Sequence, residues 1–198
     1  MSSRKEALTS LETGENLRKK TNDELVSAIL YKQIIGSLRY LFITRSYICQ
    51  SVGLLSRSTE KPQECHLTAV KGMMSYIKGK IDHGVLMSRK KKTSVDAEVY
   101  CYTDSDFSGD QDMKKSNVCY IFMIVGAPIS WSSGKQGIVA LSSCEAKYVT
   151  ASYATCQVAW IKMSLEDLKI METEKKEVVC RQQVSYRLGE SSSVSWSK

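Results

Sequence analysis

The sequence lacks the patterns that mark several common kinds of site. Its seven cysteines are odd in number and none forms a C-x-x-C pair, so neither a disulfide framework nor a zinc site is indicated. No G-x-G-x-x-G, P-loop or H-E-x-x-H segment is present. The polar start at Met1–Lys5 does not resemble a signal peptide, and no apolar run approaches the roughly 20 residues of a membrane span. We therefore expect an intracellular protein, cytoplasmic or nuclear, with reduced cysteines and no membrane contact.

What the sequence does contain is an ordinary globular mixture with a basic surplus. The 198 residues are 42% hydrophobic and 25% charged, which suits one or two small domains. Lysine and arginine number 28 against 21 acidic residues, for a net charge of +7 and a pI near 9.0. This surplus is compatible with a polyanionic partner, and nucleic acid is the leading candidate, although many basic proteins bind none.

Four consecutive segments are predicted along the chain. Residues 1–24 are polar and predict a flexible lead-in. Residues 25–88 predict a helical region, because apolar residues recur at helical spacing in three stretches. Residues 95–184 alternate like strands before another helix and a strand follow. The Ser-rich end, residues 185–198, predicts a disordered tail.

Three antiparallel strands are predicted at the start of the third segment, residues 95–184. The period changes to two from about residue 97, and a β-branched and aromatic run follows at 118–125. A returning strand is predicted at 129–132, and a further short strand could include Ile138 and Val139.

A helix and a last strand complete this segment. Ser142 and Glu145 fit an S-x-x-E capping box at a helix start. One apolar stripe follows on the helix, formed by Val149, Tyr153, Cys156, Trp160 and Met163. A strand is predicted at 177–180. Three antiparallel strands, a helix and a strand indicate an α/β fold with a mixed sheet, preceded by a small helical region.

Four stretches carry more specific motifs. They read Y-K-Q-I-I-G-S-L-R-Y-L…T-R at 31–45, H…Y-I-K-G…G at 66–84, Y-T-D-S-D-F-S-G-D at 102–110, and I-S-W-S-S-G-K-Q…A-L-S-S-C-E-A-K-Y at 129–148. In this order and spacing they resemble the copia-type retrotransposon Pol polyprotein. The resemblance covers about residues 29–188. It implies that the helical region is the connection after the reverse transcriptase palm and that a ribonuclease H-like domain follows, in a truncated and partly degenerate copy.

The resemblance also implies a reaction and its metal site. Ribonuclease H hydrolyses the RNA strand of an RNA–DNA hybrid, with two Mg²⁺ ions held by a cluster of carboxylates. The first acid of the family matches Asp104, which also remains a weak candidate metal ligand. The second and third positions hold Lys147 and Arg181 instead, and the fourth lies beyond this chain. Glu145 lies two residues from position 147, a rotation of about 200° on a helix.

Loss of activity is therefore the expectation for this copy. A cation about 4 Å from a metal position repels each unit of metal charge by about 4 kcal/mol at an effective dielectric near 20. We expect Mg²⁺, the cofactor of the family, not to bind productively here. Candidate contacts to nucleic acid are Arg89, Lys90, Lys91, Lys92, Lys114, Lys115 and Lys135, although a solvated loop is slightly favoured for the first four. Two hypotheses stay open: an RNA–DNA hybrid hydrolase, or a non-catalytic binding or inert remnant of one.

Overall fold

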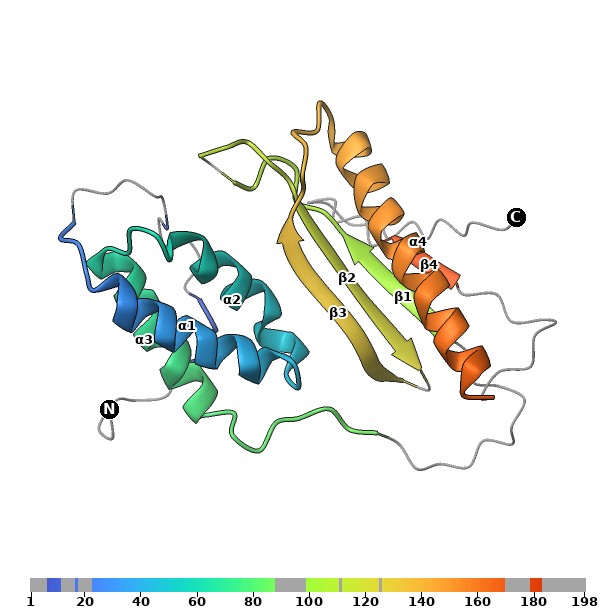
Figure 1. The fold of residues 1–198 in the computed structure, drawn as a ribbon, viewed down its shortest axis with the longest axis horizontal. Coiled ribbons are helices and arrows are strands. Elements are labelled where there is room, and N and C mark those ends of the chain that lie inside the picture. The colour runs from blue at the N-terminus through green and yellow to red at the C-terminus, as the bar shows by residue number, and fades with distance from the viewer. Residues whose placement is uncertain are drawn as a thin grey trace. The chain divides into compact units, whose positions relative to one another are not determined.

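The chain forms two compact units, residues 1–85 and 86–198. Figure 1 shows three helices in the first unit, and a sheet with one long helix in the second. The expected disordered tail and most of the expected lead-in lie outside the described residues. The computed structural model describes residues 7–11, 17, 23–87, 99–110, 112–124, 126–169 and 179–182.

The first unit is a three-helix body, and the predicted helices are all present. They are α1 (Ala28–Phe42), α2 (Cys49–Leu55) and α3 (Glu64–Lys78). Each helix spaces its apolar residues three or four apart, so it buries one face against the others. The buried cluster consists of Tyr31, Ile35, Leu38, Ile48, Val52, Leu55, Leu67, Ala69, Val70 and Met73.

Tyr31 is the largest side chain in this core and is fully buried. Its hydroxyl donates a hydrogen bond to the backbone carbonyl of Leu55 at 2.9 Å, so its polar end is satisfied. Burial raises the pKa of the phenol, which keeps it a neutral donor. Leu11 and Leu17 also pack against this cluster. The sequence did not reveal that contact from the predicted lead-in.

The start of α3 is fixed by a reciprocal cap. The backbone N–H of Gln63 donates to His66 Nδ1 at 3.0 Å, and the Gln63 side chain accepts from the backbone N–H of His66. His66 is fully buried and occupies a capping role rather than a catalytic one. The chain before α1 lies alongside this cap, because Leu25 and Gln63 form an isolated β-bridge.

The second unit contains a four-stranded mixed sheet in the order β3-β2-β1-β4. Its strands are β1 (Val99–Asp104), β2 (Asn117–Ile124), β3 (Ala127–Lys135) and β4 (Val179–Gln182). The pairs β1–β2 and β2–β3 are antiparallel, whereas β1–β4 is parallel. The predicted order of three antiparallel strands, a helix and a strand is confirmed.

The third strand is longer than predicted. It runs through Gly134 to Lys135, and Pro128 is accommodated because β3 is an edge strand with a register shift opposite it. The further strand expected around Ile138 and Val139 is wrong. Those two residues lie in the connection to the next helix, about half exposed.

The long helix α4 (Ser143–Asp167) packs on one face of the sheet. Val99, Cys101 and Phe122 point from the sheet into this core. The helix residues that are buried are Ala146, Thr150, Ala154, Ile161 and Leu165. The apolar stripe identified in the sequence is therefore not the packing face. Among the described helices, none is long and apolar enough to cross a membrane.

Gln136 joins the end of β3 to α4 from a buried position. Its Nε2 donates to the backbone carbonyl of Ala146 at 2.7 Å and to Thr150 Oγ1 at 3.2 Å. Hydrogen bonds made inside a core fix one arrangement, because any other leaves polar groups without partners.

We predict that Gln136→Leu lowers the free energy of unfolding by about 1–3 kcal/mol, since both hydrogen bonds are lost while the volume is kept. Urea unfolding of the full chain measures the change. Gln33 is exposed on α1, so Gln33→Leu should shift stability by no more than about 0.5 kcal/mol. Equal effects of the two substitutions would contradict this role for Gln136.

Candidate functional site

Asp104 lies at the end of β1, on the strand face opposite α4. Strand alternation buries Val99, Cys101 and Thr103, and it leaves Asp104 exposed. Its Oδ1 accepts a hydrogen bond from the backbone N–H of Ser105 at 2.9 Å. The aspartate that the resemblance matches to the first acid is thus accessible at a strand end.

Cys119 pairs with Asp104 across β1 and β2. It is half-buried, and burial raises the pKa of its thiol. A hydrogen bond with Ser133 lowers that pKa, while the nearby charges of Asp104 and Asp106 raise it, and the net effect is a rise. The thiol therefore stays protonated and adds no negative ligand beside Asp104.

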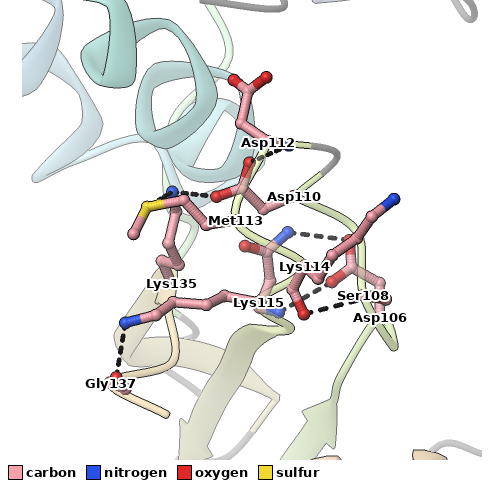
Figure 2. Close-up of polar contacts among 10 residues, drawn as sticks. Asp106, Ser108, Asp110, Asp112, Met113, Lys114, Lys115, Lys135 and Gly137 are labelled. Atoms are coloured by element: carbon pink, nitrogen blue, oxygen red, sulfur yellow. Dashed lines mark hydrogen bonds and ion pairs between the residues drawn. The ribbon is translucent and has the colours of Figure 1, made fainter. Parts of the chain in front are cut away.

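A second carboxylate close to Asp104 in sequence is already engaged. Asp106 Oδ1 accepts from the backbone N–H of Asn117 at 2.8 Å, and Oδ2 accepts from Asn117 Nδ2 at 2.8 Å (Figure 2). A Cβ at Gly109 would collide with this carboxylate. Asp106 thus links the two ends of the β1–β2 connection through Asn117. Only a glycine at position 109 leaves room for the Asp106 carboxylate.

The same connection contains a mostly buried ion pair. Lys135 Nζ, at the end of β3, contacts Asp110 Oδ2, and it also lies 3.8 Å from Met113 Sδ. The Asp110 side chain is only 7% exposed, and its Oδ1 accepts from the backbone N–H of Asp112. Burial alone raises the pKa of Asp110, but the hydrogen bonds from Lys135 and Asp112 outweigh it, so this pKa lies below its usual value.

Two of the lysines predicted to contact nucleic acid therefore have partners inside the protein. Lys135 pairs with Asp110, and Lys115 Nζ donates to the backbone carbonyl of Gly137 at 2.6 Å (Figure 2). Lys114 is exposed, with a left-handed backbone at φ 56°. Arg89, Lys90, Lys91 and Lys92 lie outside the described residues.

The start of α4 carries the next two positions of interest. Ser142 is the N-cap, and its Oγ accepts from the backbone N–H of Glu145 at 3.1 Å, as the capping box predicted. Glu145 Oε2 accepts from the backbone N–H of Leu141 at 2.6 Å. Lys147 follows on the first turns of the helix, half-buried. The carboxylate of Glu145 is committed to the cap.

Arg181 lies on β4, next to the strand that carries Asp104. The parallel register pairs it with Tyr102, two residues before Asp104. Two residues correspond to about 7 Å along a strand. The structure therefore brings position 181 to the strand beside Asp104, but not level with it.

The described part of the chain contains no group of three or more His, Cys, Asp or Glu side chains placed to hold a metal ion. Sequence reasoning missed the network of Asp106, Asn117 and Asp110. The local signal was a run of Asp, Ser and Gly, which predicts a turn but does not identify its partners on β2 and β3.

Together these features define an α/β domain with a mixed sheet, one exposed aspartate at a strand end, and an internally bonded connection beside it. No protein-family model matches the chain, and no solved structure matches it significantly. Curated relatives were found by sequence. The chain is 37% identical over 150 residues to the retrovirus-related Pol polyprotein from transposon RE1 of Arabidopsis thaliana, which covers 76% of this chain and 10% of that protein.

Two further relatives extend this comparison. The Pol polyprotein from transposon RE2 of Arabidopsis thaliana is 32% identical over 176 residues, 89% of this chain and 12% of that protein. The secreted RxLR effector protein 161 of Plasmopara viticola is 33% identical over 132 residues, 66% of this chain and 90% of that protein. The chain belongs with the copia-type retrotransposon Pol polyproteins, and it spans about a tenth of the length of the transposon relatives it matches.

The Asp110–Lys135 pair predicts a pH-dependent stability. A carboxyl with a lowered pKa in the folded protein stabilises the fold above its unfolded value of 3.8, and this contribution is lost as the pH falls through the folded pKa. Lys135→Met should therefore cost about 1–3 kcal/mol at pH 7, because Asp110 stays buried and charged without its counter-ion. The cost should shrink towards zero at about pH 3, where the carboxyl is protonated in the variant.

Urea unfolding at both pH values measures this difference. Lys162 offers a matched control, because it is 52% exposed and lies 3.9 Å from Glu166. Lys162→Met should change stability by no more than about 0.5 kcal/mol at either pH. A loss for Lys135→Met that does not depend on pH would show that the ion pair does not stabilise the connection.

Proposed function

We propose that this chain is the ribonuclease H-like segment of a copia-type Pol polyprotein, together with the connection region before it, and that this copy no longer hydrolyses RNA. One observation carries the assignment to this segment: Asp104 ends β1 in a mixed sheet of three antiparallel strands, a helix and a parallel strand. This is the position at which the resemblance puts the first metal-binding acid. The Pol relatives support the same origin.

The proposed loss of hydrolysis follows from the residues that stand at or beside the expected acid positions. Two Mg²⁺ ions need several hard oxygen ligands at one place. Glu145 caps α4, Asp106 binds Asn117, and Lys147 brings a positive charge. These residues do not fit a pair of magnesium ions, and we derive no catalytic step through them.

Activity on an RNA–DNA hybrid tests this proposal. The full chain should leave a hybrid with labelled RNA intact in the presence of Mg²⁺. The double substitution Lys147→Glu with Arg181→Asp should raise cleavage above that of the unchanged chain, because both positions then carry acids. Asp104→Asn in the double variant is the control and should abolish the gain. Cleavage by the unchanged chain that disappears with Asp104→Asn would refute the loss of function.

A non-catalytic role in nucleic-acid binding is the second candidate, favoured by the net charge of +7. The internal bonds of Lys115 and Lys135 reduce the set of cations available for phosphates. Exposed Lys114 remains among the described candidates.

The salt dependence of hybrid binding separates these lysines. Each phosphate contact contributes a slope of about −0.9 to the plot of log affinity against log salt. Lys114→Met should flatten the slope by about 1 if that side chain meets a phosphate, whereas Lys135→Met should leave it unchanged. A flatter slope for Lys135→Met would mean that the Asp110 pair opens to nucleic acid, and no binding at low salt would mark the chain as inert.

A further inference from the structure

The helix α4 is apolar on two sides. One side packs on the sheet through Ala154, Ile161 and Leu165. The other side is the stripe of Val149, Tyr153, Cys156, Trp160 and Met163, here called the outer stripe. Tyr153 is 50% exposed, Trp160 62% and Met163 65%, and Cys156 is exposed as well. A long helix in a globular domain usually carries polar residues on the side away from the core. The exposed apolar side chains of the outer stripe therefore indicate a binding surface.

The spacing of the outer stripe indicates what kind of partner fits. Its five residues follow one another at steps of four, three, four and three, which is a heptad pattern. Such a pattern keeps one seam facing a neighbouring helix over several turns. The stripe spans 15 residues, from Val149 to Met163, or about 21 Å of helix. A second helix is thus the element that matches it best.

Charge selects between the classes of partner. The 14 residues from Tyr148 to Ile161 contain no charged side chain. Because binding to a phosphate backbone depends on cationic side chains, we do not expect nucleic acid to bind this side of the helix. Two copies of a chain with a net charge of +7 repel each other, and they approach most easily through a surface without cations.

We propose that two copies of this chain associate through the outer stripe, with α4 of one copy antiparallel to α4 of the other. Half-exposed aromatic rings and Met163 from both copies bury on the order of 1,000 Å² in total, the size at which a weak specific interface forms. The antiparallel orientation opposes the two helix dipoles and separates Lys162 from its counterpart. The association is independent of any hydrolytic activity.

The mass of the full chain in solution as a function of concentration tests the association. Sedimentation or light scattering should show dimers at high micromolar concentration. Tyr153→Glu and Trp160→Glu should each weaken dimerisation by roughly tenfold or more, because a charge enters an apolar seam. Tyr40 is 77% exposed on α1 and offers a matched control, so Tyr40→Glu should leave the dimer unchanged. A monomer at all concentrations, or a dimer indifferent to both stripe variants, overturns the proposal.

Native cysteines test the orientation without any risk to folding. Cys156 is the midpoint of the outer stripe, and Cys144 lies 12 residues earlier on the same helix; both are exposed. In an antiparallel pair the two Cys156 residues lie close together, while the two Cys144 residues are on the order of 36 Å apart. A short bismaleimide should join Cys156 to Cys156, as mapped by peptide mass spectrometry. Equal joining of Cys144 to Cys144 contradicts the antiparallel arrangement.

Discussion

The carboxylate of Asp106 holds the end of β1 against the start of β2, and the placing of Asp104 at that strand end depends on this contact. Both of its oxygens are bonded to Asn117, at 2.8 Å each. Because Asp104 lies two residues before this anchor, the anchor limits where the exposed carboxylate can go. Hydrogen bonds to a charged acceptor are about twice as strong as neutral ones, so a short surface connection can be held firmly by one side chain.

Some of the lysines that make up the basic surplus form contacts within the protein, and these lysines stabilise the fold. Lys135 neutralises the mostly buried Asp110, and Lys115 satisfies a backbone carbonyl in the connection after β3. Net charge therefore overstates the cations available to an external polyanion. The inward use of lysine also explains how an acidic side chain is tolerated in a largely buried position, since a buried carboxylate without a partner is costly.

Local patterns predicted most elements, and the failures have physical reasons. Helical spacing identified α1 and α3, and the S-x-x-E pattern identified the start of α4, because these signals act within a few residues. The packing side of α4 was not predictable from apolarity, since Ala146, Ala154 and Thr150 face the sheet while larger residues point outward. Small residues let the helix approach the strands closely. A hydrophobicity pattern does not predict a packing face of this kind, because small residues add little to the apolar signal. The partners of Asp106 and Asp110 depend on register between strands, which no local pattern encodes.

The lack of space around Gly109 couples two positions that differ in chemistry. As long as Asp106 points at Asn117, any side chain at 109 meets its carboxylate. A smaller residue in place of Asp106 removes the three atoms that lie nearest to a Cβ at position 109. In diverging copies of such an element, we therefore expect substitutions at position 109 mainly where Asp106 has already been replaced.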